Sequence, residues 1–360
     1  MQLELIKRPE RSKRMALLSP LIAIGLTVVF GALLFALLGY DPGAALYVFF
    51  VEPLTSSWSL EELAVKATPL VLIGVGLAVC YLSNAWNIGA EGQLVAGAVV
   101  GSILPVMFPD FQTPLTLPLM LVMGVIGGML WASIPALLKI RFGASEILTS
   151  LMLVYVAQLG LDWLVRGPWR DPAGYNFPET QIFSDSARLM ALGDSRLHLG
   201  AVFALIAVAA LAVMLAKTLK GFEIKVLGQA PRAGRFAGFS QGRMMMFTFL
   251  VSGGLAGLAG ISEVSGTIGQ LLPTISPGYG FTAIIVAFLG RLNPIGILVA
   301  GLVLALTFLG GEAAQVSLGI SDKMVRLFQG MLLFFVLACD TLILYQIRLR
   351  VGGPAREAAK

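Results

Sequence analysis

The chain has 360 residues, of which 57% are hydrophobic and only 12% are charged, and its formal net charge is +5. A soluble globular protein is about 25% charged, so this chain cannot cover itself with polar surface, and lipid is its expected solvent. The small positive charge follows the cation bias of membrane-protein loops and requires no nucleic-acid partner.

The first 15 residues hold five Lys and Arg residues and form a predicted N-terminal tail. The apolar run 16–39 is too long for the hydrophobic region of a signal peptide, and no small-residue cleavage site follows it. We therefore expect residues 16–39 to be an anchored first span.

Apolar runs long enough to cross a bilayer, about 20 residues, recur along the chain. They predict an all-α integral membrane domain over residues 16–345, followed by a C-terminal tail at 346–360. The ten predicted segments are 16–39, 65–83, 89–107, 116–138, 147–165, 198–216, 244–264, 280–290, 295–311 and 324–345. Residues 280–290 are too few to cross alone, and such short segments are typical of discontinuous helices in transporters.

The Lys and Arg residues predict the orientation of these spans. Most of the 25 lie in the tails and in alternate loops, above all in the loop 217–243. Cytoplasmic loops carry the excess of cations. We therefore expect both tails and residues 217–243 on the cytoplasmic side, and the turn-rich loop 166–197 on the periplasmic side.

One polar stretch interrupts the apolar runs between the second and third segments. It reads NAWNIGAEGQ and contains Asn84, Asn87, Glu91 and Gln93. Glu91 follows Asn87 by four residues, so we expect these two side chains to share a helix face and Gln93 to point elsewhere. Two interpretations stay open. Glu91 caps and pins a helix start, or the four side chains line a polar path or set a gate.

The other polar and sulfur side chains within the spans give weaker signals. Phe281 and Thr282 open the short segment 280–290, where an aromatic ring and a hydroxyl suit stacking on a base or sugar. Cys80, Cys339 and His198 lack the spacing of metal ligands, so we expect no metal site. Glu263 ends a Gly-rich span near the external surface, and we expect a structural role for it.

The loop 217–243 carries six cations and one acid, Glu223. Pro231 suits the first turn of a short second helix, and Gly238 suits its end. On that helix Arg232, Arg235 and Phe236 share one face. The loop is either an amphipathic surface element held by anionic lipid or a docking element for a cytoplasmic partner.

At this loop the sequence resembles a known family. GQAPRAGRFAG (228–238) is similar to the coupling loop of ABC-importer permeases of the branched-chain amino acid, ribose and nucleoside type. Similar stretches are NIGAEGQL (87–94), GASEILTSLMLVYVA (143–157) and GYGFTAIIVAFLGRLNPIGI (278–297), and they are nearest the nucleoside and simple-sugar branch. The departures from the family pattern are Ser145, Val154, Gly234 and Thr282. Gly234 replaces the usual Ala and predicts a looser second helix.

The resemblance implies a type II ABC-importer permease fold and a transport subunit that is not itself an enzyme. It would move nucleosides or simple sugars by alternating access across the bacterial cytoplasmic (inner) membrane. The residues of the coupling loop that would contact the ATPase are Gly228, Pro231, Arg232, Arg235, Phe236 and Gly238. The expected partners are a second permease chain in a heterodimer, a periplasmic or lipoprotein substrate-binding protein, membrane lipid and a cytoplasmic ATPase.

The chain itself contains no G-x-x-x-x-G-K-[ST] phosphate loop. ATP and magnesium would therefore bind the partner ATPase, and we expect no cofactor on this chain.

Two alternative functions stay open, and a third is disfavoured by the sequence. The first is an ABC permease for branched-chain amino acids. The second is an ion-coupled secondary transporter, for which Glu91 and Glu263 are the only plausible buried acids. A membrane-embedded enzyme would need a nucleophile with a base or clustered metal ligands, and the sequence offers neither.

Overall fold

The computed structural model describes residues 2–7, 13–193, 196–321 and 323–350. It divides into two compact units, which we call the terminal unit (Met1–Tyr47 with Ile320–Lys360) and the central unit (Val48–Gly319).

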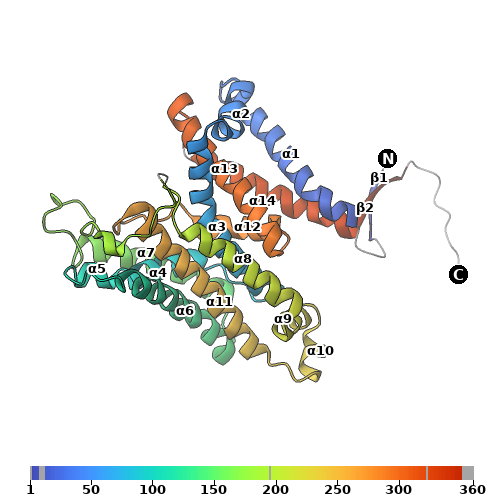
Figure 1. The fold of residues 1–360 in the computed structure, drawn as a ribbon. Helices are drawn as coiled ribbons and strands as arrows, with labels where there is room; N and C mark the ends of the chain where they lie inside the picture. The colour runs from blue at the N-terminus through green and yellow to red at the C-terminus, as the bar shows by residue number, and fades with distance from the viewer. Residues whose placement is uncertain (1, 8–12, 194–195, 322, 351–360) are drawn as a thin grey trace. The chain divides into compact units, whose positions relative to one another are not determined.

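The terminal unit pairs the two ends of the chain. Helix α1 (Lys13–Leu37) packs along α14 (Lys323–Leu344), with the rings of Phe35 and Phe328 5.3 Å apart. Strand β1 (Gln2–Lys7) runs antiparallel to β2 (Tyr345–Arg350), as Figure 1 shows. These strands lie within segments that we predicted as plain tails. Because they pair, the two ends of the chain lie side by side within the terminal unit.

The remaining elements are helical. In chain order they are α2 (Pro42–Phe50), η1 (Glu52–Leu54), α3 (Ser57–Leu82), α4 (Ala90–Gly101), α5 (Ile103–Met107), α6 (Thr116–Phe142), α7 (Glu146–Arg166), η2 (Asp185–Ala187), α8 (Gly200–Lys217), α9 (Leu219–Gln229), α10 (Pro231–Phe236), α11 (Gln241–Ser262), the π-helical turn η3 (Glu263–Ile268), α12 (Tyr279–Leu289) and α13 (Pro294–Leu318).

All ten predicted segments coincide with helices, and the all-α membrane fold class is confirmed. Among the described residues, seven helices are long and apolar enough to cross a membrane. The other three segments are α12, the shorter apolar part of α14, and α4 with α5, which are separated at Ser102. Helix α2 was not predicted, since it lies in a stretch that we treated as a loop.

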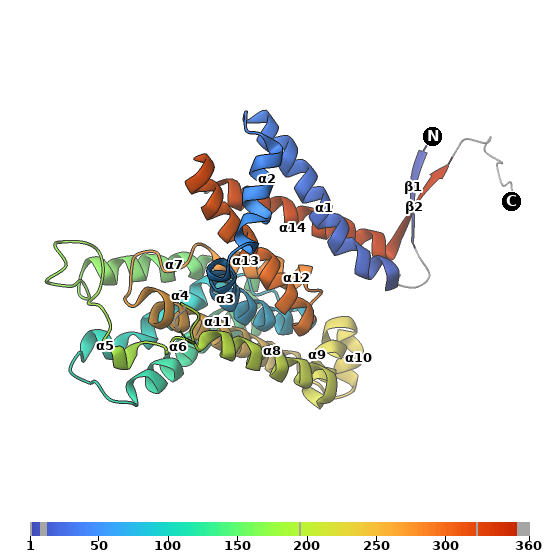
Figure 2. The same cartoon turned by 45° about the horizontal axis from the view of Figure 1, so that its top comes forward.

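The core of the central unit forms around α3 and α11. Within its most apolar window 89% of α3 is buried, against 22% for α7, so α3 lies inside and α7 at the periphery (Figure 2). Glycines bring α4, α6 and α11 into backbone contact, because a Cβ on Gly97 of α4 would overlap the backbone of Gly257 of α11. Small residues at such crossings are the usual means of packing helices in lipid.

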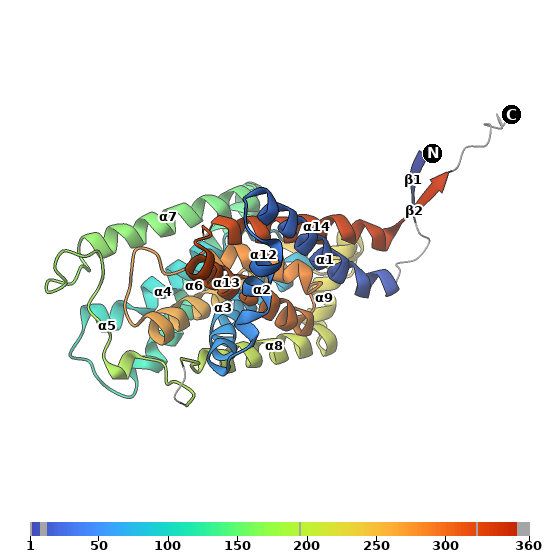
Figure 3. The ribbon, with the colours of Figure 1, turned by 90° about the horizontal axis from the view of Figure 1, so that it is seen from above.

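The two ends of the central unit are formed by different helices. Helices α9 and α10 lie at one end, and α5 lies at the other (Figures 2 and 3). At the α5 end, the predicted periplasmic loop is anchored to the chain after α11. Phe183 donates its backbone N–H to the carbonyl of Gly269 at 2.8 Å, and Leu189 donates to Ser265 at 3.0 Å.

Candidate functional site: a polar cavity and a basic knob

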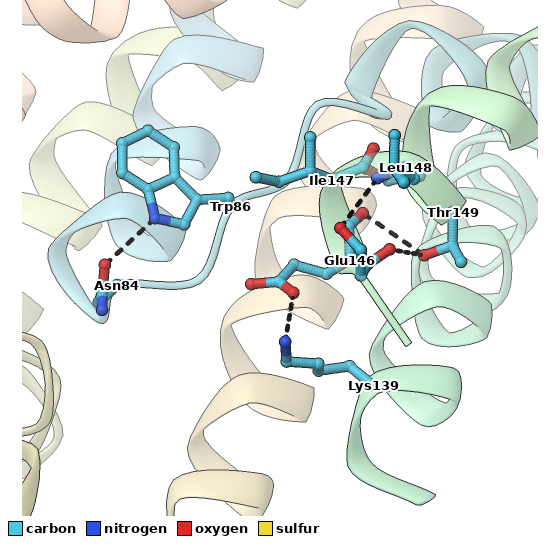
Figure 4. A network of polar contacts seen from close by, with 9 residues as sticks. Asn84, Trp86, Lys139, Glu146, Ile147, Leu148 and Thr149 are labelled. Atoms are coloured by element: carbon cyan, nitrogen blue, oxygen red, sulfur yellow. Dashed lines mark hydrogen bonds and ion pairs between the residues drawn. The ribbon is translucent and has the colours of Figure 1, made fainter. Parts of the chain in front are cut away.

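The polar stretch begins where α3 ends. Asn84 has φ 58°, a left-handed conformation that Asn tolerates better than most residues. Its side-chain oxygen accepts a hydrogen bond of 3.1 Å from the indole of Trp86, as Figure 4 shows. The chain then runs without regular secondary structure to Ala90, where α4 begins. Asn87 therefore precedes the helix, and the prediction that Asn87 and Glu91 share a helix face is wrong.

Asn87 instead pairs with Gln93, and both side chains are buried. Each amide donates to the other at 2.9 Å, and Asn87 also donates to the hydroxyl of Ser252 on α11 at 3.1 Å. Tyr81 donates its hydroxyl to the backbone carbonyl of Asn87. Hydrogen bonds within the chain thus engage both amides, which join the start of α4 to α3 and α11.

Glu91 lies in the first turn of α4 and is buried. One of its carboxyl oxygens accepts a hydrogen bond of 2.6 Å from the backbone N–H of Gly280, in the first turn of α12. The hydroxyl of Ser276 also bonds to Glu91, and it accepts from the N–H of Tyr279 at 2.9 Å. A carboxyl group at the positive ends of two helices is favourably placed, so Glu91 joins the starts of α4 and α12.

The carboxyl group of Glu91 also borders a cavity of about 380 Å³. Three parts of the chain form its wall: the start of α4, one face of α7, and the irregular segment 273–276 before α12. Its polar side chains besides Glu91 are Tyr155, Gln158, Asp162, Thr274 and Ser276.

Gln158 and Asp162 were missed in the sequence analysis. The available signal was an amide and a carboxyl group four residues apart inside an apolar span.

The other predicted path residues lie outside this cavity. Thr282 is buried within α12, and Phe281 is 38% exposed on the same helix. Neither residue lines the cavity, and neither do Asn84, Asn87 and Gln93. Near the start of α7, Glu146 pairs with Lys139 at 2.9 Å, as Figure 4 shows. Trp86 lies against aromatic neighbours, with its ring centroid 6.2 Å from that of Phe288.

Helices α9 and α10 form the second part of the site, which we call the basic knob (residues 219–238). Pro231 occupies the first turn of α10, and Gly238 closes it with φ 83°. Arg232 and Arg235 are exposed, and Phe236 is 94% exposed. The two predicted short helices are therefore present, and the three side chains predicted to share a face of the second helix are all exposed.

Two glycines fix the position of the basic knob. A Cβ on Gly228 would overlap the backbone carbonyl of Leu82, the last residue of α3. A Cβ on Gly234 would lie 2.7 Å from a methyl carbon of Leu227, so Gly234 lets α10 pack tightly on α9. The structure thus gives Gly234 a packing role that the sequence analysis did not foresee. The knob thus contacts α3 at the point where the polar stretch begins.

The α5 end of the central unit carries a charged cluster. Glu62 of α3 pairs with Arg196 at 3.0 Å, and Lys66, one turn further, pairs with Glu312 of α13 at 2.7 Å. Glu263 is buried within electrostatic range of Lys66 and Arg196. These ion pairs connect α3 with α13 and with the loop before α8.

His198 lies beside this cluster, just before α8. Its Nδ1 accepts the backbone N–H of Gly200 at 3.1 Å, and its Nε2 lies 3.2 Å from the hydroxyl of Thr267. Because Nδ1 is an acceptor, the ring is neutral, and Nε2–H donates to Thr267. Burial lowers the pKa of His198 to about 4.

The chain has many apolar spans. Two helix starts are linked at Glu91, and a basic knob is exposed. These features are those of a multi-pass membrane transport subunit. Residues 59–337 match the family model described as branched-chain amino acid transport system / permease component, and the chain belongs to this family. It is a permease subunit of an ABC transporter.

Three similar proteins extend over nearly the whole chain. The glucose ABC transporter permease protein TsgB13 of Haloferax volcanii is 36% identical, covering 94% of this chain and 92% of its own length. The nucleoside ABC transporter permease protein NupB of Lactococcus lactis is 30% identical, with coverage of 90% and 92%. The guanosine ABC transporter permease protein NupP of Bacillus subtilis is also 30% identical, with coverage of 95% and 98%.

Proposed function

We propose that this chain forms, with a second and different permease chain, the membrane path of an ATP-driven importer for simple sugars or nucleosides. The contact between Gly228 and the Leu82 carbonyl carries the proposal. It links the exposed basic knob to α3, and through the polar stretch to the cavity at Glu91. A movement imposed on the knob therefore has a direct route to the cavity.

A cytoplasmic ATPase that holds ATP and magnesium would impose that movement. Arg232, Arg235 and Phe236 would contact it, while Gly228, Pro231 and Gly238 set the shape of the knob. The ring of Phe236 is 94% exposed beside two cations, so burying it against a partner would remove apolar surface from water. A partner surface with an apolar pocket and acidic residues would engage both the ring and the two cations.

The remaining partners follow from this assignment. The knob and both chain ends would lie in the cytoplasm, and the subunit would lie in the cytoplasmic membrane. A periplasmic or lipoprotein substrate-binding protein would deliver substrate at the α5 end. The polar face of α7 is exposed on the single chain, so the second permease chain would cover it across a shared path.

Reconstitution of the complete transporter in liposomes tests the proposal. Uptake of a labelled nucleoside or simple sugar should require ATP on the ATPase side and should continue when a protonophore collapses the membrane potential. Uptake that does not require ATP but stops when the membrane potential is collapsed would instead indicate ion-coupled transport. Uptake of leucine and not of sugars or nucleosides would indicate the branched-chain amino acid alternative.

A further inference from the structure

The cavity beside Glu91 has features of a binding site and not only of a passage. Its volume of about 380 Å³ lies at the lower end of the range of small-molecule sites, about 300–1,000 Å³. Helices α4 and α7 and the segment 273–276 each contribute polar side chains to it. These parts are far apart in the sequence, so only the folded chain brings their hydrogen-bonding groups together.

The face of α7 that lines the cavity cannot face lipid. Tyr155, Gln158 and Asp162 follow one another at helical spacing and form a polar stripe on a helix that is otherwise apolar. Tyr155 is 54% exposed, and Gln158 is also exposed on the single chain. Amides and carboxyl groups that face hydrocarbon are costly. The stripe therefore faces water or a solute in the path.

The charges of the cavity wall disfavour the binding of anionic solutes. Among the described residues that line it there is no Lys or Arg. The start of α12 could attract a substrate carboxylate, as half-helix N-termini do in transporters. Here Glu91 already occupies that position by accepting the N–H of Gly280. An amino acid would find carboxyl groups for its ammonium group, but the cation beside the cavity, Arg166, is already paired with Asp162 and does not line the wall.

The same side chains suit hydroxyl groups. A carboxyl group has about four acceptor positions, and the bonds from Gly280 and Ser276 engage two of those of Glu91. Asp162 accepts from Arg166 through Oδ1 at 2.7 Å, which leaves its second oxygen for a ligand. Acidic side chains pair with ribose hydroxyls in nucleotide-binding folds, and the ring of Tyr155 offers a flat wall for a sugar or a base.

We infer that this cavity is the substrate-binding site of the path and that it takes a neutral sugar ring with adjacent hydroxyl groups. The ring is either a free sugar or the ribose of a nucleoside. Glu91 and Asp162 accept from the hydroxyls, Gln158 both donates and accepts, and Tyr155 packs against the flat face of the ligand. The inference deepens the proposed function and rests on it, since it names what the importer recognises.

The test uses the complete transporter in liposomes, with three variants of this chain. Gln158→Leu and Asp162→Asn change the cavity, and Gln315→Leu makes the same amide-to-apolar change at an exposed position near the end of α13 that does not line it. Leucine suits an apolar span, so insertion is preserved, and co-purification of the ATPase confirms assembly. The labelled substrates are a ribonucleoside, its 2′,3′-dideoxy analogue, a free pentose and leucine.

We expect Gln158→Leu to raise the KM for the preferred substrate about tenfold, the effect of one lost hydrogen bond. The preference for the ribonucleoside over its dideoxy analogue should fall in both cavity variants and stay unchanged in Gln315→Leu. Whether the nucleoside or the free pentose is taken up identifies the source of the ring. Normal wild-type uptake with the same KM and the same preference in every variant would overturn the inference alone. Wild-type uptake of leucine in place of both sugars would overturn it together with the proposed function.

Discussion

The carboxyl group of Glu91 and the backbone N–H of Gly280 lie 2.6 Å apart, although 189 positions separate them in the sequence. This bond holds together the first turns of two helices that both begin at the cavity. The start of α4 cannot move away from the start of α12 without breaking it. The bond therefore belongs both to the stability of the fold and to the shape of the path.

Substitution of Glu91 separates these two roles. Glu91→Ala leaves the N–H of Gly280 without its acceptor and should destabilise the chain by about 1–3 kcal/mol. Glu91→Gln keeps an acceptor oxygen but removes the charge, so it should preserve the melting temperature in detergent and still lower uptake. Melting curves and ATP-dependent uptake measure the two effects. Full uptake by Glu91→Gln would leave Glu91 with a structural role only.

Gly228→Ala tests the contact between the basic knob and α3. The added methyl group would overlap the Leu82 carbonyl, a backbone atom that cannot rotate away. We expect a loss of about 1–3 kcal/mol in stability and a clear fall in the uptake obtained per ATP hydrolysed. Gly242→Ala is the matched control, because its methyl group would meet Ile140 at an ordinary 3.4 Å. Equal behaviour of the two variants would contradict the prediction.

Charge reversal tests the exposed face of α10. Arg232→Glu with Arg235→Glu should weaken association with the ATPase at least tenfold and abolish coupled uptake, since close charge pairs at an interface couple strongly. A pull-down of the ATPase at two salt concentrations measures the effect. Arg141→Glu reverses an exposed cation at the end of α6 and should leave binding intact. Undiminished capture of the ATPase by the double variant would favour the lipid-bound interpretation of the loop.

His198 predicts a dependence on pH. Because burial lowers its pKa from 6.5 to about 4, the unfolded chain takes up a proton before the folded chain does. Stability at this site is therefore complete above pH 6.5 and is lost as the pH falls toward 4, by up to about 3 kcal/mol. Melting temperatures between pH 7.5 and 4.5 measure this loss. His198→Asn should flatten that part of the curve, and an unchanged slope would assign the loss to other groups.

Cysteine labelling tests the orientation. Tyr175 and Phe236 are each 94% exposed, and both natural cysteines are buried. Tyr175→Cys should react with an impermeant maleimide added outside the cell, and Phe236→Cys should react only after the membrane is opened. Labelling of both positions from the same side would contradict the ten-span arrangement.

The sequence was sufficient to predict the spans and the basic knob, because local rules determine both. Runs of apolar residues give the helices their length. Pro231 is favoured in the first turn of a helix, and Gly238 is favoured just after its end, because of their own backbone preferences. Even the short α12 was foreseen, since its apolar run is too brief to cross a bilayer.

The arrangement of the polar residues depended on contacts that no local pattern specifies. Asn87 lies outside the helix because α4 begins at Ala90, so its amide meets Gln93 and Ser252 and not Glu91. The packing role of Gly234 depends on where Leu227 lies. Gln158 and Asp162 give a visible signal within their span, but only the fold places them opposite Glu91.

The close fit of Gly228 on the end of α3 also places the basic knob at the start of the loop that leads to Glu91. From Leu82 the route to Glu91 follows nine successive residues of one polypeptide, and the Asn87–Gln93 amide pair ties down its middle. Because the backbone dihedral angles of such a loop are soft, the amide pair is what would keep it from absorbing a displacement of the knob. An extra residue inserted between Leu82 and Asn87 would lengthen this connection, and it should therefore weaken the coupling between the knob and the cavity more than an insertion in an exposed loop.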